Sequence, residues 1–464
     1  MLSKGSTMSL GSQSFVDLNS VVQQVDAWLW GWPLVGFVIA VGLVLTVALG
    51  FVQFRYFIQS WKYIFYPAKS ALDGKQTENY ITPIQAFLNT LSASIGNGSA
   101  AGMSTAVVGG GPGAAFWVFV LGFLYMVIRY AEVYASMEYH EVTPTGATRG
   151  GPMVYMKKLP GGVFLAYLYA LFCLALSLVT GNAMQCNSIR LGIERITGIS
   201  PLVTAVVLFI LLLYIMFGGA TRIIRVSERI VPIKVGLFFI TTFIVLAYYY
   251  QSLFATLKLI MMYALTPEAV AGGVVGFSVQ QAISYAMSRS LNATEAGLGT
   301  AGILYGSTRG KNAVENSIMS MASSFISSQL VCFLLIVVLV ASGVWNSGLV
   351  STQLTMAAYE TVFGTFGSIV VAFLTISFGL GVLVAYAFIG RECWLYLTRG
   401  RWPFVFTLLY CSMALFGSLS KVDLIWNATG IINAGLIGIN LVALIYLLPS
   451  IRKGLRDWEL AQKK

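Results

Sequence analysis

The sequence predicts an all-α integral membrane protein that crosses the bilayer eleven times. Apolar residues make up 57% of its 464 positions and charged residues only 10%, whereas soluble proteins carry about a quarter charged residues. The charges fall in short clusters between long apolar runs, and residues 79–128 contain no Asp, Glu, Lys or Arg. A helix crosses a bilayer with about 20 apolar residues, so these runs are long enough to be transmembrane helices.

Eleven runs have the length of a crossing, and we treat the first as a preliminary helix and number the others 1 to 10. They are residues 32–54, 82–108, 113–138, 162–189, 200–220, 231–250, 267–289, 312–343, 366–397, 402–420 and 424–450. Two other segments, 252–264 and 351–364, are short and of mixed polarity. We expect both to lie as helices across the outer face.

The positive charges are distributed unevenly between the two sides of this topology. Of the 28 Lys and Arg residues, 23 fall on one side, which the positive-inside rule assigns to the cytoplasm. The N-terminus is then outside the cell (inner) membrane and the C-terminus is cytoplasmic. The net charge of +11 therefore reflects membrane topology. We expect contact with membrane lipid and no nucleic-acid partner, and the oligomeric state stays open.

Helices 1 and 6 both contain glycine-rich, polar stretches where a regular membrane helix is expected. Helix 1 reads "SIGNGSAAG" and contains Gly96, Asn97, Gly98, Ser99 and Gly102. Helix 6 reads "AVAGGVVGFSVQQAIS" and contains Gly272, Gly273, Gly276, Phe277 and Gln280. Each begins a block of five helices. Because five is odd, the second block enters the membrane from the opposite side, which makes the two blocks an inverted repeat.

Five segments follow from this division. They are an outer N-terminal segment (1–31), the preliminary helix with a cytoplasmic linker (32–78), the first repeat (79–250), the second repeat (251–450) and a cytoplasmic tail (451–464).

Broken helices at matching positions in two inverted halves are typical of the central binding site of a transporter. Unwinding frees N–H and C=O groups, which within the membrane need a ligand, an ion or a lined cavity. A half-helix N-terminus offers donors to a carboxylate, and free carbonyls accept an ammonium group or a metal cation. A zwitterionic amino acid suits such a site. The alternative is that the glycines only allow close helix packing, which does not require the polar neighbours.

The chain resembles the alanine/glycine:cation symporter family over most of its length. The motifs that carry the resemblance are "GFVQFRYF" (50–57), "SASIGNGSAAG" with "GGPGAAFW" (110–117), "YAE" (130–132), "GGPMVYM" (150–156), "GNAMQCNS" (181–188), "TEAGLGTA" (294–301) and "GREC" (390–393). The resemblance implies a leucine-transporter-like fold of five plus five helices, uptake of alanine or glycine, and coupling to sodium.

Two departures from the family pattern concern the substrate and the cation. The family usually reads Gly-Thr-Gly-Asn in helix 1, where this chain has Gly96-Asn97-Gly98-Ser99. In helix 8 the family carries a Thr-Thr pair, where an ungapped match places Gly381 and Val382; Thr375 and Ser377 lie more than a helical turn away. The usual cation site is therefore expected to be incomplete.

Lys234, near the start of helix 5, stands where the family has an apolar residue. Its ammonium group could reach the cytoplasmic headgroups, an interpretation that the nearby Arg229 supports. Alternatively, it could point into the incomplete cation site, as in some sodium-independent relatives of this fold. Desolvation disfavours the charged form of a buried lysine, so such a residue could load and release a proton in each cycle.

Other polar residues carry secondary expectations. Arg129 and Glu132, one helical turn apart, are expected to pair. Glu295, placed after helix 6, is expected to cap a helix or act at an inner gate. Two roles stay open for Asn182, Gln185 and Asn187: they could form hydrogen bonds that support helix packing, or they could contact the substrate path.

Together these observations predict a secondary active transporter that imports alanine or glycine by alternating access, with sodium or a proton as the coupling ion and no other cofactor. No enzymatic motif is present. The expected carboxylate site is Gly96, Asn97, Gly98, Ser99 and Gly102; the expected ammonium site is Gly272, Gly273, Gly276, Phe277 and Gln280; the expected coupling site is Lys234, Thr375, Ser377 and Gly381. The alternative is an amino-acid-gated channel or a membrane sensor with the same architecture.

Overall fold

The computed structural model describes residues 25, 28–66, 81–143, 146, 148–265, 279–308, 312–420 and 422–463. Within these ranges the only strands are the antiparallel pair β1 (Glu141–Val142) and β2 (Thr148–Arg149), and the rest of the regular structure is helical. The predicted all-α class is therefore confirmed. In the described part of the chain, six helices are long and apolar enough to cross a membrane, and four apolar helices are shorter. The count of eleven crossings stays a prediction.

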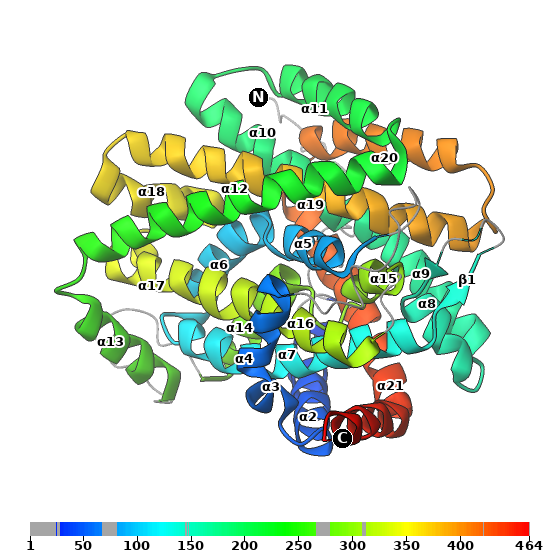
Figure 1. Ribbon diagram of the computed structural model, residues 1–464. Helices are drawn as coiled ribbons and strands as arrows, with labels where there is room; N and C mark the ends of the chain where they lie inside the picture. The colour runs from blue at the N-terminus through cyan, green and yellow to red at the C-terminus, as the bar shows by residue number, and fades with distance from the viewer. Residues whose placement is uncertain are drawn as a thin grey trace, which may run out of the picture.

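The helices follow one another through the whole described chain (Figure 1). In order they are α2 (Trp32–Ala48), α3 (Val52–Arg55), α4 (Phe57–Phe65), α5 (Pro83–Ser94), α6 (Asn97–Gly110), α7 (Ala114–Glu138), α8 (Pro152–Tyr155), η2 (Met156–Lys158), α9 (Gly162–Leu178), η3 (Val179–Ala183), α10 (Met184–Thr197), α11 (Pro201–Met216), α12 (Gly219–Tyr248), α13 (Leu253–Leu265), α14 (Val279–Thr294), α15 (Thr300–Gly306), α16 (Ala313–Phe325), η4 (Ile326–Cys332), α17 (Phe333–Ala341), η5 (Val344–Asn346), α18 (Ser351–Phe363), α19 (Phe366–Leu397), α20 (Pro403–Leu419) and α21 (Val422–Gln462).

The outer helices expose apolar side chains, as contact with lipid requires. On α11, Val207 and Ile210 are 58% and 59% exposed, and on α13 Phe254 is 81% exposed. Soluble monomers rarely present contiguous apolar surface on this scale. These helices surround α5 and α6, which lie at the centre of Figure 1 between α12 and α7.

The first predicted break is present. The helix α5 begins with a capping box between Thr82 and Gln85 and ends at Ser94. Ile95 (φ −103°, ψ 88°) and Gly96 (φ −130°, ψ −170°) leave the helical conformation, and α6 starts at Asn97. The chain therefore crosses the protein interior as two half-helices with free peptide groups between them.

The second half also contains a break, at residues 295–299, which the sequence analysis did not single out as a break. The predicted glycines Gly272, Gly273 and Gly276, with Phe277, lie outside the described residues. The helix α14 continues to Thr294, beyond the predicted end of helix 6 at residue 289, and residues 295–299 separate it from α15.

Left-handed backbone explains where α14 stops. Gly297 and Gly299 have φ of 85° and 80°, which glycine adopts without steric cost, and Glu295 has φ of 57°. The "TEAGLGTA" motif (294–301) follows α14, as expected of the signature after helix 6, and forms a break between α14 and α15. The break predicted around Gly272, Gly273 and Gly276 lies outside the described residues and stays a prediction.

The helices α6 and α14 run side by side in opposite directions. A Cβ atom placed on Gly98 would lie 3.7 Å from the carbonyl oxygen of Asn292, and one placed on Gly110 would lie 3.2 Å from Cα of Ala282. The beginning of α6 therefore meets the end of α14. Arg289, one of the 23 Lys and Arg residues that the predicted topology places on the cytoplasmic side, lies in α14 beside Gly102.

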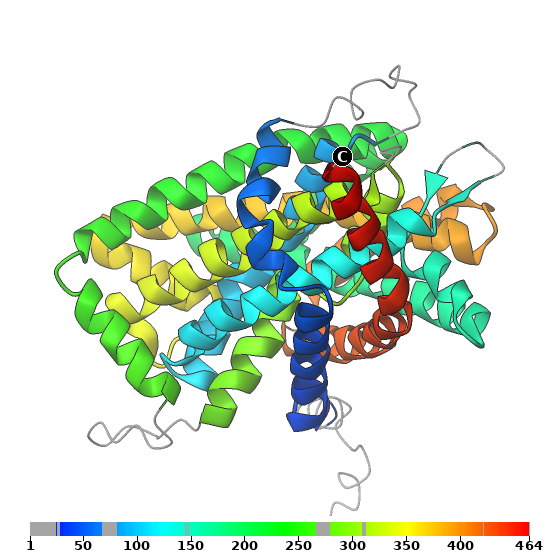
Figure 2. The same ribbon diagram turned by 60° about the horizontal axis from the view of Figure 1, so that its bottom comes forward.

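The remaining half-helices also meet, and the C-terminal helix closes one side. Ile81, before α5, forms a β-bridge with Thr308, after α15. In Figure 2 the last part of α21, which contains Pro449, changes direction and runs along α7. An ion pair of 2.9 Å between Arg55 and Glu459 fastens this end.

Candidate functional site

Lys234 on α12 holds the end of α5. Its side chain is completely buried, and Nζ donates hydrogen bonds to the carbonyl oxygens of Ser92 (2.8 Å) and Ile95 (2.6 Å). The last carbonyls of a helix lack partners within the helix, and a cation is favourable at that end. The structure therefore places the amine at the first break and not among the headgroups.

Gly381 on α19 provides the space for this amine. A Cβ atom at Gly381 would lie 2.6 Å from Nζ of Lys234 and 2.9 Å from Oγ of Ser92. The Ser92 hydroxyl donates to the Gly381 carbonyl oxygen (2.9 Å), and Nζ of Lys234 lies 6.0 Å from the centre of the Phe378 ring. A residue with a side chain at Gly381 would displace the lysine.

Two other predicted coupling residues do not join this group. The hydroxyl of Thr375 donates to the carbonyl of Val371, and that of Ser377 donates to the carbonyl of Leu374. Both hydroxyls are therefore used within their own helix, as serine and threonine commonly do in helix interiors.

Asn97 begins α6 at the centre of the protein. It is 1% exposed, and within the described residues its side-chain nitrogen and oxygen have no hydrogen-bond partner. Its backbone N–H donates to Oε1 of Gln185 (3.2 Å). Buried polar groups are nearly always hydrogen-bonded, so an amide left over at a helix N-terminus indicates a place for a ligand.

The other predicted residues of helix 1 divide into two groups. A Cβ atom on Gly96 would lie 2.5 Å from Cγ2 of Val382, so the bare backbone is required at this point of the break. Gly98 also lies at the break, beside α14. The Ser99 side chain is buried beside the thiol of Cys332, and Gly102 packs against α14.

Gln280 is not part of the site. It is exposed and lies at the beginning of α14, whereas the break in helix 1 is next to the end of α14. At about 1.5 Å per residue, the length of α14 separates the two places.

Gln185 is the one residue of its polar group that reaches the break. It accepts from the backbone of Asn97, and its Nε2 donates to the carbonyl of Thr180 (3.1 Å). Asn182 and Asn187 instead donate to backbone carbonyls of residues 410, 417 and 420, in and just after α20. For these two, the packing alternative is confirmed.

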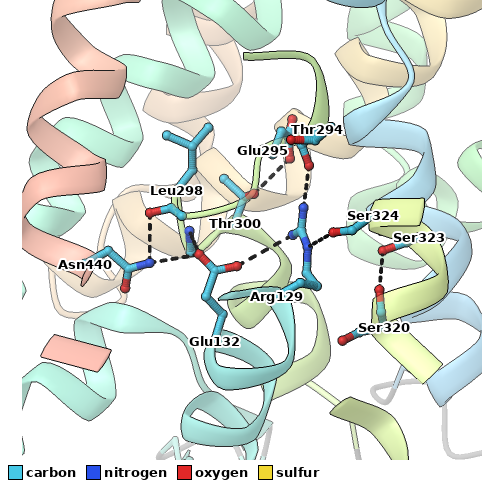
Figure 3. Close-up of polar contacts among 12 residues, drawn as sticks. Arg129, Glu132, Thr294, Glu295, Leu298, Thr300, Ser320, Ser323, Ser324 and Asn440 are labelled. Atoms are coloured by element: carbon cyan, nitrogen blue, oxygen red, sulfur yellow. Dashed lines mark hydrogen bonds and ion pairs between the residues drawn. The ribbon is translucent and has the colours of Figure 1, made fainter. Parts of the chain in front are cut away.

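Side chains from three helices hold the second break, as Figure 3 shows in part. Arg129 on α7 donates to the Thr294 carbonyl at the end of α14, and Asn440 on α21 donates to the Gly297 carbonyl (2.9 Å). Tyr169 on α9 donates to the Leu298 carbonyl (2.7 Å). The carbonyls freed at this break are thus bonded to protein side chains.

Glu132 completes this arrangement. Its Oε1 accepts from the Gly299 backbone N–H and from Nδ2 of Asn440, both at 2.9 Å. Its Oε2 lies 3.9 Å from Nη1 of Arg129, which confirms the expected pair. Breaking such a buried pair leaves an uncompensated charge.

The two breaks together form a site with opposite polarity at its two ends. The N-terminal end of α6, with its free N–H groups, lies beside the C-terminal end of α14, with its carbonyl groups. Helix dipoles favour an anion at the first end and a cation at the second. The geometry can therefore hold a small zwitterion, with its carboxylate near Asn97.

Comparison with known proteins finds a matching family model and several similar transporters. Residues 15–464 match the model of the sodium:alanine symporter family. An uncharacterized transporter of Haemophilus influenzae is 31% identical, over 95% of this chain and 96% of that protein. The sodium/alanine symporter AgcS of Methanococcus maripaludis is 28% identical, over 93% and 95%. The putative sodium/proton-dependent alanine carrier protein YrbD of Bacillus subtilis is also 28% identical, over 96% and 93%.

The fold is similar to that of MhsT, whose crystal structure was solved in complex with L-phenylalanine. The TM-score is 0.54 at 12% sequence identity, over 82% of this chain and 99% of that chain. At this identity the likeness concerns the fold alone, which is that of the leucine-transporter-like carriers.

Proposed function

The chain belongs to the sodium:alanine symporter family, and from this premise we propose that it imports alanine or glycine together with a proton. Its family and relatives support a cation-coupled amino-acid symporter. The two finer parts of the proposal are the substrate and the coupling ion, and each is argued from separate residues.

The observation that carries the proposal is the meeting of two half-helix ends beside an unpartnered amide. Asn97 has both polar side-chain atoms free among the described residues, at the start of α6. The end of α14 lies next to it, where Gly98 approaches the Asn292 carbonyl. A small amino acid fits this polarity. The choice of alanine or glycine as the substrate is supported by the family and by relatives named for alanine.

Lys234 supports a proton as the coupling ion. Its ammonium group lies against Gly381, where the resemblance would place a hydroxyl pair for sodium, and it binds two carbonyls of α5. A lysine charge and a sodium ion would repel each other in this volume. A protonated amine donates both hydrogen bonds to α5, and loss of the proton would weaken them. Proton movement is thereby linked to the position of this half-helix.

The polar groups argue against a channel with the same architecture. A channel needs a continuous polar path, whereas Asn97, Lys234 and Gln185 gather at one depth around the first break. Counterflow of labelled alanine separates the two functions, because a carrier exchanges substrate across the membrane and an open pore does not.

Uptake into proteoliposomes with imposed gradients tests the proposal. We expect labelled alanine to accumulate when the outside is acidic relative to the inside, in buffers without sodium. Accumulation that requires a sodium gradient and ignores the pH gradient would exclude proton coupling while leaving the substrate assignment intact.

Membrane orientation is part of the same proposal, with eleven crossings, the N-terminus outside and the inverted repeat described above. The five native cysteines are buried, so introduced cysteines report with little background. We expect Ser347→Cys, in an exposed turn before α18, to react with an impermeant maleimide from outside intact cells. Ala461→Cys, near the end of α21, is expected to react only after the membrane is permeabilised.

A further inference from the structure

Glu295 is a buried carboxylate at the second break. It follows α14 directly, it has a left-handed backbone (φ 57°), and it is 3% exposed. A residue with a side chain rarely adopts this conformation, and a buried charge is costly unless hydrogen bonds or an opposite charge meet it. We therefore expect the Glu295 carboxylate to have hydrogen-bond donors or a cation close to it.

The partners within the protein are hydrogen-bond donors and not cations. Thr300 Oγ1 donates to Oε2 of Glu295 (2.8 Å), and the Tyr386 hydroxyl faces the carboxylate without meeting hydrogen-bond geometry. Among the residues that the structure describes, no ion pair within 4.0 Å includes Glu295. The carboxylate is held in orientation but lacks a direct cationic partner.

The two nearest cations are already engaged. Arg129 donates to Thr294 and Ser324 and pairs with Glu132. Lys234 donates to the two carbonyls of α5. Both are near enough to attract Glu295 electrostatically, but neither can turn towards it without giving up these bonds.

The helices around Glu295 are the ones that surround the first break. Tyr386, beside its carboxylate, belongs to α19, which also presses Val382 against Gly96. The Tyr386 ring packs against Gly181 in the π-helical segment η3, close to Gln185. A ligand whose carboxylate lies at Asn97 would therefore have its other end near Glu295.

Resting on the function proposed above, we propose that the carboxylate of Glu295 binds the ammonium group of the substrate amino acid. An ion pair recognises an ammonium group more strongly than neutral carbonyls do. A site whose buried carboxylate stays unpaired rejects analogues that lack the amine, because the ligand then leaves that charge without a partner. The ammonium is thus a requirement for binding.

Charge balance agrees with this assignment. The four buried charged side chains around the breaks are Lys234, Arg129, Glu132 and Glu295, and their formal charges cancel. An amino-acid zwitterion adds no net charge. Its ammonium meets Glu295 while its carboxylate meets the α6 end, so both charges of the ligand are compensated inside the membrane.

Direct binding of alanine and of propionate, which lacks the ammonium group, tests the proposal on the full-length protein in nanodiscs. We expect the unmodified protein to bind alanine at least tenfold more tightly than propionate. In Glu295→Gln we expect alanine affinity to fall at least tenfold while propionate affinity stays within twofold, so that the preference is lost. Glu295→Asp keeps the charge and should keep the preference.

Glu459→Gln is the matched control, because it neutralises a carboxylate that pairs with Arg55 near the end of α21 and contacts neither break. It should leave the preference for alanine unchanged. If Glu295→Gln does not fold, Thr300→Val replaces it, since loss of the orienting hydroxyl should reduce the preference several-fold.

The outcomes separate this inference from the function on which it rests. An unchanged alanine-to-propionate ratio in folded Glu295→Gln or Thr300→Val, or an equal loss for both ligands, overturns the role of Glu295 alone. Failure of the unmodified protein to bind either alanine or glycine overturns the proposed function and this inference with it.

Discussion

Replacing Lys234 with methionine should abolish proton coupling while leaving a folded protein. The change removes two hydrogen bonds from a buried ammonium to the carbonyls of Ser92 and Ile95. Bonds to charged groups contribute about 1.5–3 kcal/mol each, which gives about 3–6 kcal/mol for the pair. A lysine within the membrane costs about 2.5–3.5 kcal/mol, and methionine removes this cost. The net change is between about −0.5 and 3.5 kcal/mol of destabilisation, small enough for folding.

The functional effect should be much larger than the effect on stability. Without a titratable amine at Gly381, no proton can load at the end of α5. We expect accumulation driven by an acidic outside to fall at least tenfold in Lys234→Met. Counterflow of alanine, which needs no gradient, should persist at a measurable rate.

Gly381→Ala is a second, independent test of this prediction. Its methyl group would lie 2.6 Å from Nζ of Lys234, so it should displace the amine without removing it and reduce coupling in the same direction. Undiminished accumulation by a pH gradient in Lys234→Met, at equal protein incorporation, would refute the assignment of the proton to this lysine.

Three further substitutions test the two breaks. Asn97→Ala should weaken alanine binding about tenfold or more, because a hydrogen bond to a charged ligand contributes about 1.5–3 kcal/mol; equilibrium binding to the purified protein measures the change. Gly96→Ala places a methyl group 2.5 Å from Cγ2 of Val382 and should abolish uptake; adding Val382→Ala should restore part of it, and no rescue would argue against steric contact as the cause. Glu132→Gln unbalances Arg129 and should destabilise the protein by about 3–5 kcal/mol, seen as a lower unfolding temperature in detergent; an unchanged temperature would contradict the buried pair.

The first break lies where the sequence predicts it, whereas the break at residues 295–299 was not singled out from the sequence, for a physical reason. Around Gly96 the glycines stand next to Asn97 and Ser99 in a charge-free run, so polarity and backbone freedom point to the same place. In the second half, several glycines precede Gln280 in an apolar run. The break that the structure describes contains Glu295 and two glycines after an amphipathic helix. From sequence, Glu295 is expected only to cap a helix or act at an inner gate, because Tyr386, which faces its carboxylate, is far away in the chain.

The roles of individual site residues also depend on contacts with residues that are distant in the chain. The residues around Lys234 in the sequence do not decide whether its amine reaches the headgroups or the cation site. The choice depends on Gly381 and on the carbonyls of α5, which are far away in the chain. Gln185 was one of three similar amides. A π-helical segment precedes it at Val179–Ala183, and such segments often mark functional sites. The residue types alone do not predict where a π-helical segment forms.

The two breaks are stabilised in different ways, and this difference indicates where movement occurs. At the second break, Arg129, Asn440 and Tyr169 each hold a carbonyl, so its backbone is fixed by three helices. At the first break, a single amine holds the end of α5, and the amide of Asn97 has no protein partner among the described residues. At the second break, Glu295 offers a side chain to the ligand but the backbone is already bonded, whereas at the first break a proton can change the bonds that hold the backbone itself. We therefore expect the coupling ion to act on α5, with α15 and the second break as the frame against which α5 moves.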